Sequence, residues 1–509
     1  MKDRSSLVAE LVLYAEKYLY LKKEDTTYIT NLLLHRLNIP SPADETITEC
    51  RTVTEIIEDI LHYAVVDGLT TESEKTLLET ELLGIVSPLP SEFIDIFNKT
   101  KNTKGSKAAT DEFFAFCKNV NYIRTKDIAK NIKWETTGAK GDIHITINLS
   151  KPEKDPKDIL KAKLEDKNSK KYPKCMLCKE NVGFWGTYSL PARQTLRTVP
   201  ITLNNEAWYM QYSPYMYFDN HCIAFSSEHR PMKVDINTYK AMLDFVDLFP
   251  HYFIGSNAAL PIVGGSILSH DHYQGGAKVL PMLSRPDKAC YVSKEYPNVK
   301  VSIADWYNSV IRMTSADRSE LEKFAFTVNK TWYNYSDAEV GIIACDTEQH
   351  NAITPIATFE NGQYTINFIL RNNRTDENHP YGIFHPAESL HNIKKEGIGI
   401  IEVMGLFILP GRLQSEMLLI EKHLTKQKII DLDALTENDA MYKHKEMIKE
   451  LEYSCNGIFD SKAVKNKIDE YINNACQEIL YTTGVFKNDE QGNAAFDRFM
   501  SNLGLTKIN

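Results

Sequence analysis

The chain has 509 residues, of which 43% are hydrophobic and 25% are charged. This composition is ordinary for a globular protein with room for two or three domains, and it excludes a disordered or fibrous chain. The formal net charge is −9 at pH 7. The chain as a whole therefore has no basic footprint for nucleic acid, and an anionic substrate would need a local cationic pocket.

The N-terminus shows no sign of a secretory signal, because Glu10, Glu16 and Lys17 interrupt its first apolar segment. No window approaches the roughly 18 consecutive apolar residues that indicate a membrane span. The chain contains nine cysteines, an odd number that is typical of reduced thiols with room for a metal site. We therefore expect a cytoplasmic protein.

Residues 1–133 are predicted to form a helical N-terminal region. Apolar residues recur at three- and four-residue steps, beginning with Leu7 and Leu11. Thr71 followed by Glu74 indicates the start of a helix. No cluster of catalytic residue types occurs here, so we expect a role in packing or assembly.

Residues 134–285 are predicted to form an α+β domain. Alternation from Ile143 to Leu149 indicates a half-buried strand, and the mixed charges from Lys151 to Lys174 favour a solvated helix or linker. Asn204-Asn205 is typical of a turn. Further strands are expected at 198–203, 208–212, 215–218, 221–225 and 253–257, with a helix over 237–249 before the last of them.

Residues 286–415 loosely repeat this order and are predicted to form a second, degenerate sheet unit. A helix is expected near 316–330, with strands near 340–343 and 364–370. Residues 416–509 return to helical spacing with charged faces and no motif.

Cys175 and Cys178 form a C-x₂-C that can wrap one turn around Zn²⁺. A redox pair or two ordinary thiols would have the same spacing. The chain has no second C-x₂-C, so a zinc site would have to include histidines from farther along.

The stretch from Gly264 to Gly276 contains His270-Asp271-His272-Tyr273-Gln274. If it is extended, His270, His272 and Gln274 share one face and the residues between them share the other. The flanking glycine pairs let a bulky anion approach this polar face. The alternative is an incidental pair of histidines, or one metal ligand beside a core residue.

Four features occur in a fixed order: the C-x₂-C, a Ser-x-x-His that ends at His229, the His-x-His-x-Gln, and Gly-Ile-Ile-Glu-Val-Met-Gly at 399–405. Together they resemble galactose-1-phosphate uridylyltransferases, a nucleotidyl-transferring branch of the histidine-triad superfamily. The resemblance is closest to the longer second class, found mainly in Gram-positive bacteria, which has a helical N-terminal extension. It covers roughly residues 174–413 and implies two histidine-triad-like antiparallel sheet halves with flanking helices.

The resemblance implies an exchange of UMP between UDP-glucose and galactose 1-phosphate through a covalent uridylyl-histidine, with His272 as the nucleophile. Imidazole suits this role because its ordinary pKa of about 6.5 leaves much of it unprotonated at neutral pH. Gln274 matches the family glutamine that donates to a phosphoryl oxygen. Two displacements through a covalent enzyme predict ping-pong kinetics.

The resemblance also implies a zinc site of two cysteines and two histidines, formed by Cys175, Cys178, His229 and His270. Zinc bound to His270 would fix this strand and therefore the orientation of the His272 side chain. The alternative is that this class has lost the metal and the four residues only pack. The iron site of the first class does not match the histidines of this chain.

Residues carried over for substrate binding fall into three groups, and a structural role is the alternative for most of them. The nucleoside and phosphate candidates are Asn204, Asn205, Asn257, Ser266 and Ser269. Arg193 and Arg197 are the candidates for a pyrophosphate clamp. Glu402 matches a glutamate that binds the hexose, and burying it in an apolar run without partners would be costly.

The expected partners are the small-molecule substrates UDP-glucose, UDP-galactose and hexose 1-phosphates, with no nucleic acid and no membrane, and the resemblance implies a homodimer. Two other functions stay open from the sequence. One is another histidine-triad nucleotidyltransferase or a dinucleoside polyphosphate phosphorylase. The other is a zinc-stabilised binding protein without catalysis.

Overall fold

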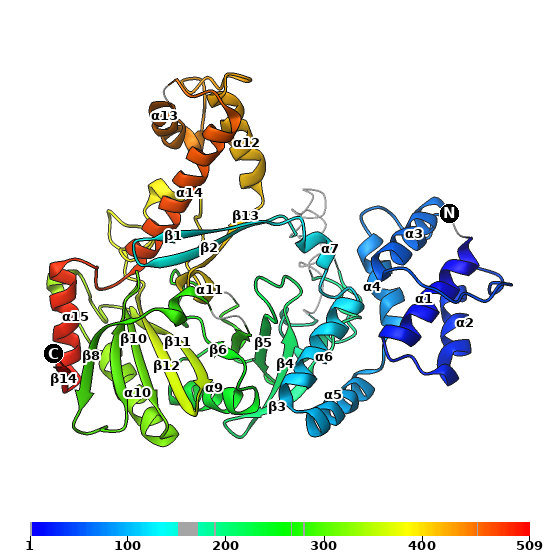
Figure 1. The fold of residues 1–509 in the computed structure, drawn as a ribbon, viewed down its shortest axis with the longest axis horizontal. Helices are drawn as coiled ribbons and strands as arrows, with labels where there is room; N and C mark the ends of the chain where they lie inside the picture. Colours follow the sequence, from blue (N-terminus) through cyan, green and yellow to red (C-terminus); the bar gives the residue numbers. More distant parts are fainter. Residues whose placement is uncertain are drawn as a thin grey trace. The chain divides into compact units, whose positions relative to one another are not determined.

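The structure is a computed structural model that describes residues 3–150, 172–187, 190–265, 267–277, 280–455 and 457–508 (Figure 1). The chain forms two compact units, each considered by itself. Unit 1 comprises Met1–Ala129, Pro152–Pro231 and Ser269–Gly276, and unit 2 comprises Lys130–Lys151, Met232–Leu268 and Ala277–Asn509. The predicted division into four regions, with boundaries after residues 133, 285 and 415, stays a prediction. The linker predicted from Lys151 to Lys174 lies mostly outside the described residues.

The first part of unit 1 is helical, as predicted. Ile56 and Ile60 are buried along α3, and Thr52 begins this helix with a capping box to Glu55. Thr71 bonds to Glu74, but the next helix begins one residue later, so this pair marks the turn before it. The helices are α1 (Arg4–Tyr18), α2 (Thr26–Arg36), α3 (Val53–Val66), α4 (Lys75–Ile85), α5 (Pro90–Lys104), α6 (Ser106–Asn119) and α7 (Thr125–Ile128).

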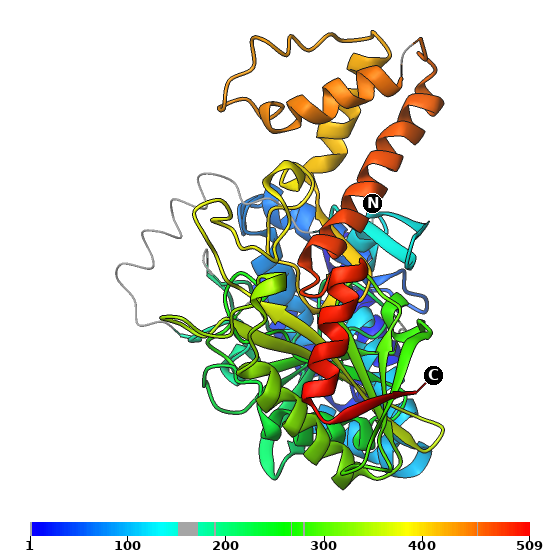
Figure 2. The same cartoon turned by 90° about the vertical axis from the view of Figure 1, so that its left-hand side faces the viewer.

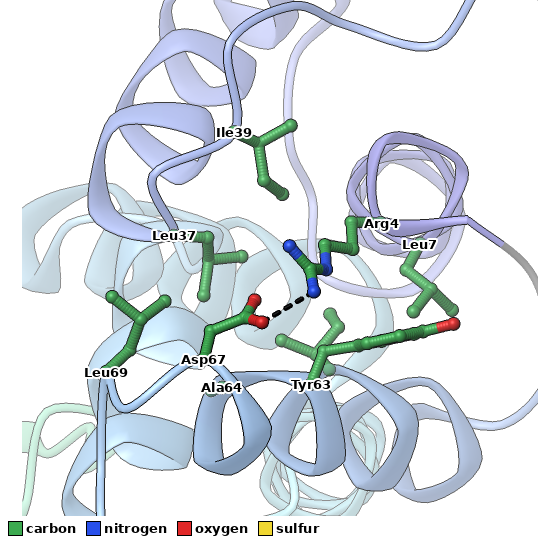
Figure 3. A pocket seen from close by; sticks show the side chains of 9 residues that line it. Arg4, Leu7, Leu37, Ile39, Tyr63, Ala64, Asp67 and Leu69 are labelled. Carbon is green, nitrogen blue, oxygen red and sulfur yellow. Dashed lines mark hydrogen bonds and ion pairs between the residues drawn. The ribbon is translucent and has the colours of Figure 1, made fainter.

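A shallow pocket in this helical part of unit 1 has about 260 Å³ of empty space, including open solvent (Figure 3). Leu7, Leu37 and other apolar side chains line it. Arg4 Nη2 lies 2.5 Å from Asp67 Oδ1, so the two charges in the pocket neutralise each other. We therefore attribute the pocket to helix packing. No helix in the described ranges is long and apolar enough to cross a membrane.

The sheet of unit 1 is antiparallel, in the order β3-β4-β5-β7. Its strands are β3 (Val199–Leu203), β4 (Glu206–Tyr212), β5 (Cys222–Ser226) and β7 (His272–Gly276). Asn204 and Asn205 both have positive φ, 48° and 59°, and form the predicted turn between β3 and β4. Asparagine tolerates this conformation, which a two-residue hairpin requires.

The predicted strand at 215–218 is wrong, because this segment reverses the chain between β4 and β5. Ser213 N–H donates to the His221 carbonyl at 2.8 Å, which closes the loop. Met216 and Asn220 have positive φ there, and Pro214 has no N–H for a ladder. The aromatic residues that suggested a strand instead pack beside His221.

The main sheet of unit 2 is also antiparallel, and α9 (Ile236–Leu248) and α10 (Arg318–Tyr333) pack against it (Figure 1). The predicted strand at 340–343 is wrong, because a 3₁₀ turn ends at Val340 and Gly341 adopts φ 73°. The strands, in order, are β6 (Phe253–Gly255), β11 (Asn351–Glu360), β12 (Gln363–Asn372), β10 (Val310–Ser315), β9 (Lys300–Ala304), β8 (Asp287–Ser293) and β14 (Leu505–Ile508).

A smaller sheet and a group of helices complete unit 2. The sheet pairs β1 (Ile132–Gly138), the predicted strand β2 (Gly141–Asn148) and β13 (Leu406–Pro410). The helices follow from Ile400 onward, and Figure 2 shows the longest of them leading to the C-terminal end. They are α11 (Ile400–Val403), α12 (Arg412–Leu424), α13 (Lys445–Ser454), α14 (Ser461–Thr483) and α15 (Glu490–Asn502). The fold is α+β, as predicted.

Glu416 of α12 is a buried carboxylate that contacts Arg412, Lys443 and His444 at 2.6, 2.6 and 3.0 Å. Burial alone would raise the pKa of Glu416, but the hydrogen bonds from His444 and Lys443 and the charge of Arg412 lower it to about 2. Since this pKa lies below the unfolded value of about 4.3, the carboxylate stabilises the fold above pH ~5, and this stability is lost as the pH falls toward 2.

We expect Glu416→Gln to lower the free energy of unfolding at pH 7 by about 2–3 kcal/mol. The difference from wild type should shrink between pH ~5 and ~3, which denaturant unfolding at several pH values measures. The exposed Glu446, which pairs with Lys449, provides the control variant Glu446→Gln with almost no effect. An equal difference at pH 7 and pH 3 would contradict this account of Glu416.

Candidate functional site

Four side chains that can bind a metal meet at one point of unit 1. Cys175 and Cys178 come from the segment before the 3₁₀ turn Lys179–Asn181, His229 follows β5, and His270 precedes β7. Their ligand atoms all lie within 4.8 Å of one another. Residues that are 95 positions apart in the sequence thus form one cluster.

The distances within this cluster are close to, and slightly shorter than, those between neighbouring ligands of a tetrahedral zinc ion. Sγ of Cys175 lies 3.2 Å from Nδ1 of His270, Sγ of Cys178 lies 3.2 Å from Nδ1 of His229, and the two sulfurs are 3.5 Å apart. Zinc bonds of about 2.0–2.3 Å place neighbouring ligands of a tetrahedron roughly 3.3–3.8 Å apart. Nε2 of His270 bonds to the Ser226 carbonyl at 3.0 Å, which leaves Nδ1 free of its proton and available as a ligand.

The two thiols of the cluster differ in acidity. Burial raises the pKa of Cys175, but the hydrogen bonds with His270, Leu177 N–H and Cys178, together with the charge of His270, outweigh burial, so the pKa of this thiol lies below its usual value. Burial raises the pKa of Cys178 to about 11. A bound cation would favour the thiolate at both positions.

His272 begins β7 and is buried. Its Nδ1 lies 2.7 Å from the carbonyl oxygen of His270. Since a carbonyl only accepts hydrogen bonds, Nδ1 carries the proton and Nε2 carries the lone pair. Burial lowers the pKa of His272 to about 4, so the ring is neutral at pH 7. Among the described residues, none hydrogen-bonds to Nε2.

Gln274 follows on the same strand and shares the face of His272, because side chains two residues apart point the same way. Its Oε1 lies 3.1 Å from Nε2 of His221. Sequence reasoning missed His221. The contact depends on the pairing of Cys222 with Gly275 across β5 and β7, and no local pattern reveals that pairing.

The residues between these polar groups have other partners. Asp271 Oδ2 accepts from Arg230 Nε at 3.2 Å. The ring of Tyr273 stacks on Trp208, with centroids 4.8 Å apart. Arg230 was not identified from the sequence either. These contacts anchor the stretch that carries His270 and His272.

The nucleotide candidates of unit 1 lie in different environments. Asn204 and Asn205 form the β3–β4 turn, and Ser269 is exposed directly before His270. Ser266 lies outside the described residues. The guanidinium of the half-buried Arg193 lies over the Tyr122 ring at 5.6 Å.

The contacts of Arg197 are those of a residue that stabilises the fold. It is buried, and its guanidinium donates to the carbonyls of Pro88, Gln194 and Leu196 at 2.6–2.9 Å. Because these bonds use most of its donors, we keep only Arg193 as a candidate for the phosphate clamp.

In unit 2, Glu402 lies on α11 and is nearly buried. Its Oε1 lies 3.0 Å from Lys394 Nζ, and its Oε2 accepts from the Gly399 N–H at 3.2 Å. Lys394, missed from the sequence, is the partner that makes a buried carboxylate tolerable here. Asn257 Oδ1 accepts from the Ile400 N–H at 2.8 Å. The Asn257 side chain therefore satisfies the N–H of the first residue of α11.

Arg371 stands near Glu402 and is fully buried at the end of β12. Its Nη2 donates to the Ile398 carbonyl at 2.9 Å. Its Nε and Nη1 have no hydrogen-bond partner among the residues of the described ranges. Burial lowers the pKa of Arg371 to about 10, so the group stays charged at pH 7.

Two family models match the chain. Residues 35–231 match the N-terminal domain of galactose-1-phosphate uridyl transferase, and residues 245–445 match its C-terminal domain. These ranges contain every candidate residue named above.

Curated relatives named galactose-1-phosphate uridylyltransferase align over almost the full chain. The protein of Caldanaerobacter subterraneus is 42% identical, with 100% of this chain and 99% of the relative covered. The protein of Fusobacterium nucleatum is 44% identical, with coverage of 98% and 99%. The protein of Bacillus subtilis is 42% identical, with coverage of 95% and 94%.

Among solved structures, yeast Ap4A phosphorylase Apa2 aligns with 60% of this chain and 92% of its own, at 11% identity and a TM-score of 0.32. Similarity at that level supports no conclusion about this chain.

Proposed function

This chain belongs to the galactose-1-phosphate uridylyltransferase family, and we propose that it transfers the uridylyl group through a covalent bond to His272. The family reaction exchanges UMP between UDP-glucose and galactose 1-phosphate, which gives glucose 1-phosphate and UDP-galactose. The observation that carries the proposal is the 2.7 Å hydrogen bond from Nδ1 of His272 to the His270 carbonyl. It directs the lone pair to Nε2, which has no partner in the described structure.

In the first half-reaction, Nε2 of His272 attacks the α-phosphorus of UDP-glucose. A P–N bond forms, the P–O bond to glucose 1-phosphate breaks, and that product leaves with the bonding electrons. The proton stays on Nδ1, where the His270 carbonyl stabilises the positive charge that the ring acquires. In the second half-reaction, a phosphate oxygen of galactose 1-phosphate attacks phosphorus, the P–N bond breaks, and UDP-galactose forms.

Gln274 supports both displacements by donating to a nonbridging oxygen of the transferred phosphoryl group. A positioned donor of this kind typically contributes about 3 kcal/mol to transition-state stabilisation. Its place two residues after His272 on the same strand supports the role.

The proposal includes zinc held by Cys175, Cys178, His229 and His270. When bound there, zinc supplies a rigid support for the start of β7, and the four residues leave no open position for substrate. A homodimer and a cytoplasmic location complete the proposal. The homodimer rests on the resemblance, and the location rests on the N-terminal sequence, the lack of a long apolar window and the cysteine content.

Exchange of labelled glucose 1-phosphate into UDP-glucose, with no galactose 1-phosphate present, tests the proposal. A covalent uridylyl-enzyme permits this half-reaction, and a direct transfer between two bound sugars forbids it. The rival adenylyl transfer predicts exchange only with an adenine nucleotide.

We further propose that Glu402 binds the hexose hydroxyls. Glu402→Gln should lower kcat/KM for galactose 1-phosphate and for UDP-glucose by about 10- to 100-fold, because a hydrogen bond to a charged group contributes about 1.5–3 kcal/mol. The affinity for UDP, which lacks the hexose, should change less than about 2-fold, and equilibrium binding measures it.

The exposed Glu388 provides the control Glu388→Gln, with unchanged kinetics. A parallel loss of UDP affinity in Glu402→Gln would show that the change disturbs the site through Lys394 instead of through the sugar.

A further inference from the structure

His221 lies directly before β5 and bonds to Gln274 on β7. It is only 2% exposed, and the rings of Tyr217 and Phe218 pack against its imidazole at 5.5 and 4.5 Å between centroids. Its backbone is also fixed, because its carbonyl accepts from Ser213 N–H and its N–H donates to the Phe218 carbonyl. The imidazole is thus held in one orientation.

The hydrogen-bond partners of its two ring nitrogens determine the tautomer of His221. Burial lowers the pKa of His221 to about 4, so at pH 7 the ring carries one proton. Its Nδ1 is buried without a partner among the described residues. An orphaned buried N–H is rarer and costlier than an unused lone pair. The proton therefore lies on Nε2, which donates to Oε1 of Gln274.

This bond fixes which end of the Gln274 amide faces the substrate. The oxygen is held by His221, and the amide nitrogen makes no hydrogen bond in the part of the chain that the structure describes. Gln274 is only partly buried and shares the face of His272. A flipped amide would point its oxygen at the phosphoryl group and would repel the negative charge that develops there.

We propose that His221 is a positioning residue: its Nε2–H holds Oε1 of Gln274, so that the amide presents its N–H groups to the phosphoryl group transferred to His272. This inference rests on the proposed roles of Gln274 and His272. It adds a residue that acts through Gln274 and does not touch the substrate.

Two variants of matched chemistry test it. In His221→Gln the amide nitrogen is as many bonds from Cα as Nε2 of histidine, and in His221→Asn it is as many bonds away as Nδ1. We expect His221→Asn to lower kcat about 10- to 100-fold with KM for UDP-glucose changed less than about 3-fold. We expect His221→Gln to stay within about 5-fold of wild type. Equal losses in the two variants, or a loss in KM alone, would overturn the proposal.

A double-mutant cycle separates positioning from packing. In a Gln274→Ala background, His221→Asn should cause no further loss of kcat, because the amide it orients is gone. A merely structural histidine would lower kcat by the same factor in both backgrounds, which would overturn the proposal.

Nitrogen-15 NMR of histidine-labelled wild type tests the tautomer without any loss of folding. The ring signals absent from His221→Gln should be those of a neutral imidazole protonated at Nε2, and protonation at Nδ1 would overturn the proposal.

Failure of the proposed function would give a different result from failure of the positioning role. If the proposed function is wrong, Gln274→Ala or His272→Ala would keep wild-type activity. A defective Gln274→Ala beside a fully active His221→Asn would overturn only the positioning role.

Discussion

Replacement of His272 by alanine is expected to abolish uridylyl exchange, with kcat lowered by about 10⁴-fold or more. Loss of a covalent nucleophile removes the whole two-step route and not merely one stabilising contact. Within the described ranges, the ring bonds to no group besides the His270 carbonyl, so its removal leaves few groups unsatisfied. Initial-rate measurements with UDP-glucose and galactose 1-phosphate provide the test.

Two controls accompany this variant. His272→Ala should keep the metal content and unfolding midpoint of wild type within a few degrees, because the four clustered ligands remain. The exposed His62 of α3 provides the matched variant His62→Ala, with full activity. An active His272→Ala enzyme would contradict the covalent mechanism.

Replacement of Cys175 by serine is expected to have the second-largest effect, through the loss of zinc. The four ligands come from three segments, and the metal would bind all three together. We expect the loss to cost on the order of 3 kcal/mol, which for a unit of this size corresponds to a fall of roughly 6–12 °C in the unfolding midpoint. Activity should fall as well, because His270 and the aim of His272 lose their support.

Metal analysis and thermal unfolding of the same samples measure this effect. Wild type should contain about one zinc per chain and Cys175→Ser should contain almost none. The exposed Cys345 gives the control Cys345→Ser, with wild-type zinc and stability. A wild-type protein purified without zinc, with a stability unaffected by Cys175→Ser, would show that the four residues only pack.

Local patterns were sufficient for most of the fold. Helical spacing identified the N-terminal helices, and Asn204-Asn205 indicated a turn, whose two positive φ values asparagine tolerates. The two strands that were predicted wrongly, at 215–218 and 340–343, have strand-forming composition. At 215–218 the chain reverses direction, which overrides that preference. At 340–343 a glycine with positive φ prevents an extended strand.

The candidate site was predictable where a residue belongs to a motif with fixed spacing. The four candidate metal ligands lie together as the resemblance implied. Residues that act through partners distant in the sequence were not predictable. His221 meets Gln274 only through the pairing of β5 with β7, and Lys394 meets Glu402 only through the fold of unit 2. Arg197 looked like a phosphate ligand because a sequence does not show that backbone carbonyls use its donors.

Native mass spectrometry at neutral pH tests the covalent mechanism most directly, since acid would cleave a phosphoramidate. After incubation with UDP-glucose and removal of glucose 1-phosphate, the protein should gain the mass of one uridylyl group, located on the peptide that contains His272. The adduct should disappear when galactose 1-phosphate is added, and UDP-galactose should be released. No gain in mass, or the same gain in His272→Ala, would contradict the mechanism.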